Sequence, residues 1–441
     1  MIFSMDLRRA AKGDCFLLHT GTKEEPGLVL VDGGPRGVYA PELKPRIAQI
    51  REARGLAANR ALDLDVVMVS HVDDDHIHGI LDLTSELLAD RAAHRPLPLQ
   101  VLSFWHNSFE DLIGASPAEL TAAFKGSFAA STEGGLPPDA DLDPHDEELD
   151  LETATAGLMV LASIEQGARL RSQAQALGFP LNAEFDGKLV VADSGTPVEV
   201  ASGLAFRVVG PMLPEIEELH RKHQEWLKEL KREGRSPPDA LAAYIDRSVP
   251  NLSSIVVLAE AEGKSMLLTG DARGDKILEG LEQIGAMPVG GTMHVDLVKV
   301  PHHGSANNLA DDFFTRITAD HYVFSGDGEH GNPELQSMEM LWNARGDAPY
   351  LVHLTYALEE LDAERKKDWA KQQASERRRQ NRDPARELEV RPDWSSEQHG
   401  LVAFFAAHPA LQAKLRIVEK GRAHVIDLGE SLAASWPGLG D

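Results

Sequence analysis

The sequence predicts an α/β fold in which a long, largely helical insertion separates two strand-rich segments. Short apolar runs bounded by turn residues alternate with a helical pattern in the first 80 residues, and similar runs return after residue 250. The region between them has mainly helical and acidic character. At 441 residues the chain exceeds one ordinary domain. We therefore expect a core formed by residues 1–85 and 250–345, an insertion at 86–249, and a C-terminal extension at 346–441.

The first strands are predicted from their apolar runs and from the turns that end them. Cys15–His19 and Leu28–Val31 are such runs, and the second is followed by the turn sequence Asp32-Gly33-Gly34-Pro35. Residues 42–55 have a helical pattern, and Leu64–Ser70 is a mostly apolar run typical of a buried strand. Strands that alternate with a helix favour an α/β layer.

The remaining elements follow from the same signals. We expect an acidic, polar loop at 137–151 and a charged helix at 358–380 that opens the extension. The other predicted helices are 80–88, 115–125, 154–177 and 214–232, and the other predicted strands are 99–105, 254–258, 265–268, 295–300, 321–324, 401–405, 415–418 and 424–428.

Composition narrows the class of protein. Hydrophobic residues make up 42% and charged residues 26%, as in soluble globular proteins. The single cysteine, Cys15, excludes an internal disulfide and a cysteine-based zinc cluster. The N-terminus does not resemble a signal peptide, and no run of about 18 apolar residues predicts a membrane span. We expect a cytoplasmic protein without a membrane partner. The net charge of −26 disfavours a broadly basic nucleic-acid surface.

One run of the chain concentrates potential metal ligands. Residues 71–78 read His-Val-Asp-Asp-Asp-His-Ile-His and follow the predicted strand Leu64–Ser70 directly. Three imidazoles and three carboxylates at the end of a buried strand need partners, because burying unpaired charge is very costly. Mixed imidazole and carboxylate ligands suit zinc, manganese or iron better than calcium. The alternative is a solvated polar loop whose histidines have no common role.

Spacing along the run places several of these side chains together. His71, Asp73 and Asp75 can share one side of an extended turn because side chains alternate with period two. His76 then opens the next helix. The pattern resembles the His-x-His-x-Asp-His motif of the metallo-β-lactamase superfamily, with Asp73 in place of the second histidine. This substituted form is similar to the nuclease-like domain of the bacterial DNA-uptake competence channel.

Four further segments resemble that superfamily in the same order along the chain. They are Gly13–Leu18, Leu30–Gly34, Leu267–Asp271 and Val298–Ser305, the last of which contains Val-Pro-His-His-Gly-Ser. With the first motif they cover about 1–85 and 250–335. The resemblance implies an αββα sandwich of metallo-β-lactamase type, interrupted by the insertion and followed by the extension.

The resemblance also implies a role for each matching residue. His71 and Asp73 would bind a first divalent ion, Asp75 and His76 would bind a second, and Asp271 would bridge the two. The remaining residues have the following implied roles: His303 completes the second site, with His302 close by or in its place; Asp75 and His303 are the catalytic candidates; and Asp32 holds a ligand histidine.

The chain departs from the family pattern at two places. Asn332 stands before Pro333 where the family usually has a histidine that contacts the substrate, and His330 either takes over that role or belongs to a structural loop. The family's separate third-motif histidine is also not evident, and Asn251 and Ser253 occupy roughly that region. The first metal is therefore expected to have few strong ligands.

The extension contains the one basic cluster of the chain. Nine lysines and arginines between residues 364 and 386, including Arg377, Arg378 and Arg379, exceed the four acidic residues there and leave a local charge of +5. This cluster is a candidate contact for a nucleic-acid backbone. It is equally consistent with a solvated helix face that carries ordinary charge pairs.

The resemblance implies a metal-dependent hydrolase that uses two divalent ions, zinc or manganese, and a metal-bridging hydroxide. Phosphodiester bonds of DNA or RNA are the substrate it favours. Hydrolysis of a small ester, lactone or cyclic nucleotide is the alternative, which the negative charge supports. A second alternative is a degenerate-site scaffold or regulator in a multi-protein system, with a protein partner bound through the insertion or the extension.

Overall fold

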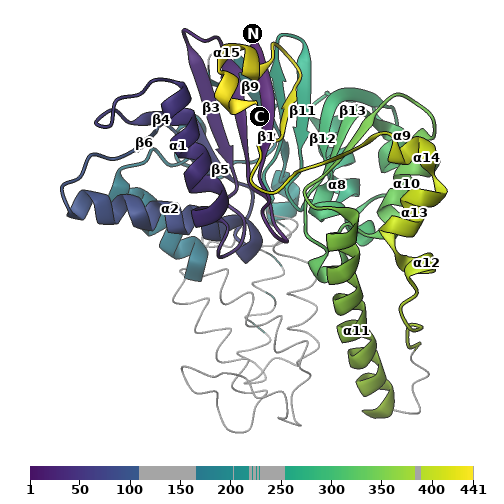
Figure 1. Ribbon diagram of the computed structural model, residues 1–441. Helices are drawn as coiled ribbons and strands as arrows, with labels where there is room; N and C mark the ends of the chain where they lie inside the picture. The colour runs from purple at the N-terminus through teal and green to yellow at the C-terminus, as the bar shows by residue number, and fades with distance from the viewer. Residues whose placement is uncertain are drawn as a thin grey trace.

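The computed structural model describes residues 1–108, 165–201, 203–217, 254–382 and 389–440, together with positions 221, 225 and 228. Two large β-sheets lie at its centre and helices cover their outer faces (Figure 1). The α/β class predicted from the sequence is confirmed.

Five strands from the first 106 residues and one from the C-terminal end form a six-stranded sheet. Strands β1 to β3 are antiparallel neighbours, whereas β5 and β7 continue the sheet in parallel from β3. The strand order is β16 (Val425–Asp427), β1 (Ile2–Leu7), β2 (Phe16–Gly21), β3 (Pro26–Val31), β5 (Val66–Val69) and β7 (Phe104–His106). A separate pair joins β4 (Leu62–Leu64) to β6 (Leu99–Val101).

Strands between residues 198 and 417 form an eight-stranded sheet. Strands β8 to β11 are antiparallel neighbours, and β11 to β15 are parallel. The strand order is β15 (Leu415–Ile417), β14 (Leu351–Leu354), β13 (Ile317–Phe324), β12 (Met293–Lys299), β11 (Lys264–Leu268), β10 (Val256–Ala261), β9 (Leu204–Gly210) and β8 (Val198–Ala201).

Alternation of side chains along the strands builds two cores. On β3, Val29 and Val31 face the cluster shared with the eight-stranded sheet, whereas Leu28 and Leu30 face the opposite cluster under the helices. Trp105 of β7 contacts Phe206 of β9 edge to face, with ring centroids 5.6 Å apart, which ties the two sheets together.

Helices close both outer faces of the sandwich. α1 (Lys44–Ala53) and α2 (Asp74–Ala92) cover the six-stranded sheet, and α8 (Gly274–Gln283), α9 (Phe313–Arg316) and α10 (Leu335–Arg345) cover the eight-stranded one (Figure 1). The described residues also contain α11 (Leu358–Arg382), α13 (Leu401–Ala407) and the single turns α12 (Ser396–His399), α14 (Pro409–Gln412) and α15 (Leu432–Ser435). None of the helices in the described ranges is long and apolar enough to cross a bilayer.

The sheets use more of the chain than the predicted core ranges contain. β7, β8 and β9 come from the range predicted as a helical insertion, and β14, β15 and β16 come from the predicted extension. These strands complete the sheets by pairing with strands that are distant in the sequence, which local patterns do not show. The domain boundaries at 85, 250 and 345 therefore differ from the observed sheet boundaries.

Single elements also differ from expectation. The run Leu401–Phe405 was expected to be a strand but lies in helix α13, where the buried residues Leu401 and Phe405 are four positions apart on one helix face. Residues 165–177 are helical, as expected. The predicted helix 115–125, the acidic loop 137–151, the positions Asn251 and Ser253, and most of the predicted helix 214–232 lie outside the described residues.

Candidate metal centre

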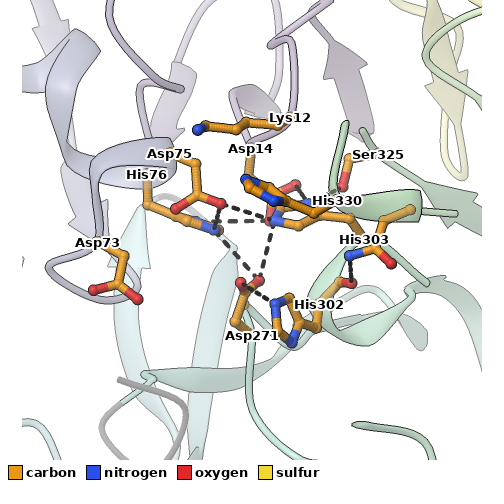
Figure 2. A network of polar contacts seen from close by, with 12 residues as sticks. Lys12, Asp14, Asp73, Asp75, His76, Asp271, His302, His303, Ser325 and His330 are labelled. Atoms are coloured by element: carbon orange, nitrogen blue, oxygen red, sulfur yellow. Dashed lines mark hydrogen bonds and ion pairs between the residues drawn. The ribbon is translucent and has the colours of Figure 1, made fainter. Parts of the chain in front are cut away.

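The candidate site lies where strand ends of both sheets meet. β3, β5, β11, β12 and β13 all end at this edge, since neighbouring parallel strands have their carboxyl ends on the same side. β2 runs antiparallel to β3, with Phe16 opposite Val31, so its beginning lies at the same edge. The loops at this edge and the first turn of α2 carry the residues predicted as metal ligands, His71, Asp73, Asp75, His76, Asp271 and His303, together with His302; all of them except His71 are labelled in Figure 2.

Close packing of two glycines sets the position of His76. A Cβ atom on Gly79 would lie 2.0 Å from the carbonyl oxygen of Gly33, so only glycines allow the first turn of α2 to approach the end of β3. The amide of Gly33 donates to the carbonyl of His76 at 2.8 Å. The Gly-Gly sequence after Asp32 therefore serves to place the helix that carries His76.

Asp32 lies directly behind the ring of His76. Its carboxylate accepts hydrogen bonds from the amide and the hydroxyl of Ser70, both at 2.7 Å, and lies 2.8 Å from Nδ1 of His76. These bonds leave Nε2 of His76 to face the centre of the site. A carboxylate behind an imidazole is the usual arrangement for a histidine that binds a metal.

Four side chains converge on one point. Nε2 of His76 and Nε2 of His303 lie 3.3 and 3.4 Å from Oδ1 of Asp271, and Nε2 of His303 is 3.4 Å from Oδ2 of Asp75 (Figure 2). Donor atoms of Asp75, His76, Asp271 and His303 all lie within 4.8 Å of one another. A group of this kind can hold one metal ion.

A second group surrounds the other oxygen of Asp271. Oδ2 of Asp271 is 3.7 Å from Nε2 of His71 and 3.6 Å from Nε2 of His302. Oδ2 of Asp73 is 3.6 Å from the same nitrogen of His71. Asp271 therefore stands between two groups of potential ligands, with one carboxylate oxygen directed at each.

Several ligand atoms are buried without a hydrogen-bond partner. They include Nε2 of His71, His76 and His303 and Oδ1 of Asp271. An unpaired buried polar atom costs of the order of 1–3 kcal/mol, so a cluster of such atoms facing one another is unfavourable unless something binds between them. Imidazole nitrogens and carboxylate oxygens are suitable ligands for zinc or manganese.

The pKa values of the site also indicate an excess of negative charge. Burial opposes a proton on His303, yet the carboxylates of Asp271 and Asp14 raise the pKa of His303 to about 10. Burial likewise disfavours the charged form of Asp75, yet His76 and His303 lower its pKa. Burial, with the neighbouring charge of His76, lowers the pKa of His71 to about 3. The carboxylates therefore attract positive charge, which protons on His76 and His303 supply when no cation is bound.

The backbone is strained at the second ligand segment. His302 and His303 have φ angles of +47° and +54°, a region that non-glycine residues seldom adopt. Such strain is found where the surrounding structure needs a side chain in one direction. Here it directs both imidazoles toward Asp271 (Figure 2). Nδ1 of His303 lies 2.8 Å from the hydroxyl of Ser325, which orients the ring.

Two buried residues of the site were missing from the sequence-based set. Nζ of Lys299 lies 2.5 Å from Oδ2 of Asp14 and 3.8 Å from Oδ1 of Asp271, and both side chains of the Lys299–Asp14 pair are 1% exposed. Oδ1 of Asp14 is 3.5 Å from Nδ1 of His303. The pair sits behind the ligands. A lysine within the apolar strand that precedes Val300 was the available signal.

The remaining predicted residues lie outside the two groups of potential ligands. Asn332 donates a long hydrogen bond of 3.4 Å to the carbonyl of His302, so it supports the ligand loop. His330 is half-exposed and contacts Glu329. Arg377, Arg378 and Arg379 are exposed on α11, and Arg377 pairs with Asp393 at 3.2 Å. None of these three arginines lines the cleft beside the site.

Comparisons with known proteins add similarities of limited extent. No model of a protein family matches the chain. Microtubule-associated protein 1A of Rattus norvegicus is 27% identical over 141 residues, which are 32% of this chain and 5% of that protein.

Two solved structures are similar over most of the chain but at low superposition scores. The metallo-beta-lactamase fold protein YhfI from Bacillus subtilis is 11% identical, with 80% of this chain and 96% of that one covered and a TM-score of 0.36. A protein of unknown function from Enterococcus faecalis V583 is 8% identical, with 81% and 71% covered and a TM-score of 0.25. The chain's own geometry shows an α/β protein in which clustered histidines and aspartates can bind metal ions.

Proposed function

We propose that this protein is a metal-dependent hydrolase of metallo-β-lactamase type with a two-metal centre. Asp75, His76 and His303, with Oδ1 of Asp271, would hold one ion. His71, Asp73 and His302, with Oδ2 of Asp271, would hold the other. The observation that carries the proposal is the convergence of unpartnered buried nitrogen and oxygen atoms on Asp271.

The chain's own residues prepare this centre for chemistry. When bound, two divalent cations activate water and stabilise the negative charge that develops on a phosphate. Asp32 and Ser325 orient the imidazoles of His76 and His303 from behind, so that each ring presents Nε2 to the centre. Asp75 has a side chain 21% exposed and lies 3.4 Å from His303, a position from which it can orient a water molecule or accept its proton.

Phosphodiester bonds are the proposed target. The support is the resemblance of the ligand run, with Asp73 in place of a histidine, to the nuclease-like competence domain, and the exposed arginines of α11 as a candidate backbone contact for DNA or RNA. The second candidate is hydrolysis of a small ester, lactone or cyclic nucleotide. It is favoured by a specific observation, the acidic lining of the cleft that opens beside His302.

Hydrolysis assays test the proposal directly. The manganese-loaded protein should hydrolyse bis-p-nitrophenyl phosphate, and plasmid, single-stranded DNA and RNA are assayed beside it. Asp75→Asn should lower the rate by about 10²–10³-fold, the usual effect of removing one group that stabilises a transition state. Glu199→Ala, on the exposed side of the edge strand β8, is the matched control and should retain full activity.

The outcomes of these assays distinguish the proposed functions. Hydrolysis of nucleic acid that Asp75→Asn abolishes supports the nuclease. Hydrolysis of the small diester alone supports the second candidate. If the wild type hydrolyses neither substrate with zinc or manganese, the hydrolase proposal is wrong, and a scaffold or regulator with a degenerate site becomes the better explanation.

A further inference from the structure

A large cleft begins at the candidate metal centre and runs along the C-terminal extension. It encloses about 890 Å³ and starts at His302, whose Nε2 lies 3.6 Å from Asp271. α10 lines one side, and α11 with residues 389–399 lines the other. In Figure 1, α11 and α12 lie beside each other on the same side of the molecule as α10. Small-molecule sites in proteins usually have about 300–1,000 Å³, so the cleft suits a ligand of that size.

The extension is joined to the ligand loop by direct contacts. Nε of Arg365 on α11 donates to the carbonyl of Gly331 at 3.2 Å, and Asn332 next to it donates to the carbonyl of His302. Arg365 is buried, with 7% of its surface exposed. The wall of the cleft is therefore connected to the loop that carries a metal ligand, and a ligand in the cleft would reach the metal centre at His302.

An aromatic cluster fixes the far wall. The ring of His399 stacks on that of Trp369 with centroids 4.3 Å apart, and Trp394 packs edge to face on Trp369 at 5.7 Å. The indole of Trp369 donates to the carbonyl of Pro392 at 2.8 Å. All three rings line the cleft and are half-buried. They give the wall a rigid apolar surface against which a ring of a ligand can pack.

The charged groups of the lining exclude a polyanion. Five carboxylates and two arginines line the cleft among the described residues. Both arginines already have partners, because Arg365 pairs with Asp362 at 2.9 Å and Arg391 pairs with Glu376 at 2.7 Å. A nucleic-acid backbone needs cations along its path, and the lining has a net negative charge instead. Only the end at the metal centre is suited to a phosphate.

The exposed polar groups of the lining favour a hydrogen-bond donor. Glu339 and Gln336 on α10 and Gln398 on α12 are exposed side chains of the lining. Carboxylates only accept hydrogen bonds, and amides do both. N–H and O–H groups of a neutral ring would be satisfied by such a lining, while the face of the ring would pack on the aromatic cluster.

We propose that this cleft binds the non-reacting part of a small phosphodiester substrate, a neutral ring rich in N–H or O–H donors, such as a nucleoside or a sugar. The inference rests on the proposed hydrolase function and favours its second candidate, a small substrate, over DNA or RNA. It assigns one phosphate to the metal centre and the rest of the substrate to the extension. The cleft therefore selects a compact substrate over a polymer.

Three diesters test the inference with the manganese-loaded full chain. They are the p-nitrophenyl esters of thymidine 5′-phosphate, of a glucose phosphate and of methyl phosphate. At least one ring diester should exceed the methyl diester about tenfold in kcat/KM, the worth of one good hydrogen bond to a charged group. Glu339→Ala should remove most of that preference through KM. Glu199→Ala, the matched control outside the cleft, should retain it. The thymidine and glucose arms distinguish nucleoside from sugar.

Equal kcat/KM for all three diesters in the wild type, or an intact preference in Glu339→Ala, would overturn the inference without touching the hydrolase proposal. If no diester is hydrolysed, calorimetry still decides. Thymidine 5′-phosphate or glucose phosphate should bind more tightly than inorganic phosphate, and Glu339→Ala should weaken that binding. Equal affinities would contradict the assignment. Single-stranded DNA that displaces the bound phosphate ester from the wild type but not from Glu339→Ala would also contradict it.

Discussion

Two clusters of buried charge are balanced in different ways: one lies on β1 of the six-stranded sheet, and the other lies where the strand ends of both sheets meet. Asp6 of β1 accepts from Nε of Arg46 at 2.6 Å and from Nη1 of Arg8 at 3.3 Å, and Nε2 of His19 is 3.4 Å away. Both of its oxygens therefore have partners within the protein. At the strand ends, Asp271 and the imidazoles of His71, His76 and His303 direct unpartnered atoms at one another.

The difference indicates what each cluster is for. Buried charges that are paired and hydrogen-bonded by the chain stabilise one arrangement of it, and they need nothing from outside. Buried ligands that face one another with an excess of carboxylate need a cation. The Asp6 cluster is therefore structural, and the Asp271 cluster is a candidate binding centre. The predictions below test that distinction.

The largest expected effect is on the structural cluster. Asp6→Asn leaves Arg46, which is 2% exposed, without its charge partner, and should lower the free energy of unfolding by about 3–5 kcal/mol. Urea unfolding measures the loss, which should be the same with and without manganese. Asp63→Asn, at an exposed strand position, is the control and should change stability by less than about 0.5 kcal/mol. If manganese restored the stability lost in Asp6→Asn, the Asp6 cluster and the Asp271 cluster would not be independent.

The metal centre should respond in the opposite way. Manganese or zinc at about a hundred times its dissociation constant should raise the free energy of unfolding of the wild type by about 2.7 kcal/mol. Asp75→Asn should lose most of that gain, since it removes a ligand, whereas Asp6→Asn should keep it. Thermal unfolding with metal and with chelator gives the comparison. Equal gains in wild type and Asp75→Asn would remove Asp75 from the ligand set.

Acid should weaken the structural cluster over a defined range. Burial alone would raise the pKa of Asp6, but His19, Arg46 and Arg8 lower it to about 2 from its ordinary 3.8. A lowered pKa means that the ionised carboxylate stabilises the fold above pH 3.8, and this contribution is lost as the pH falls toward 2. The loss amounts to about 2 kcal/mol. In chelator, the difference in free energy of unfolding between wild type and Asp6→Asn should decrease by about 2 kcal/mol as the pH falls below 4. A constant difference would show that Asp6 titrates normally.

A smaller effect is expected behind the ligands. Asp32→Asn keeps the shape of the side chain but removes the charge next to Nδ1 of His76, and should weaken metal binding by about 10–100-fold. Ser325→Ala removes only a neutral hydrogen bond to His303, so its effect should be smaller. Titration with zinc measures both. If Ser325→Ala weakens binding more than Asp32→Asn, the carboxylate does not position His76 as described.

The sequence predicted candidate ligands where local signals mark them. Asp75 and His76 belong to a contiguous run at a strand end, Asp271 and His303 follow recognisable strands, and the structure brings these four side chains together. A lysine inside an apolar strand marks Lys299, but no local signal shows that it pairs with Asp14, which lies 285 residues away in the sequence. The cleft was also hidden, because it forms only when the extension packs against α10.

Sheet membership was predicted less well for the same reason. β8 and β9 were not among the predicted strands, and their place in the eight-stranded sheet depends on pairing with β10 across a range that does not resemble the core. The Leu401–Phe405 run is apolar enough for a strand or a helix, and only its burial at every fourth position decides for the helix.

The most direct test of the central claim is the metal content of the protein. The full chain, purified without chelator and dialysed after loading with manganese or zinc, should contain about two ions by elemental analysis, as a two-metal centre requires. A variant with Asp271→Ala should contain fewer, because that residue faces both groups, whereas Asp6→Asn should retain the full content. A wild type with almost no bound metal, or an Asp271→Ala variant that binds as much as the wild type, would contradict the account.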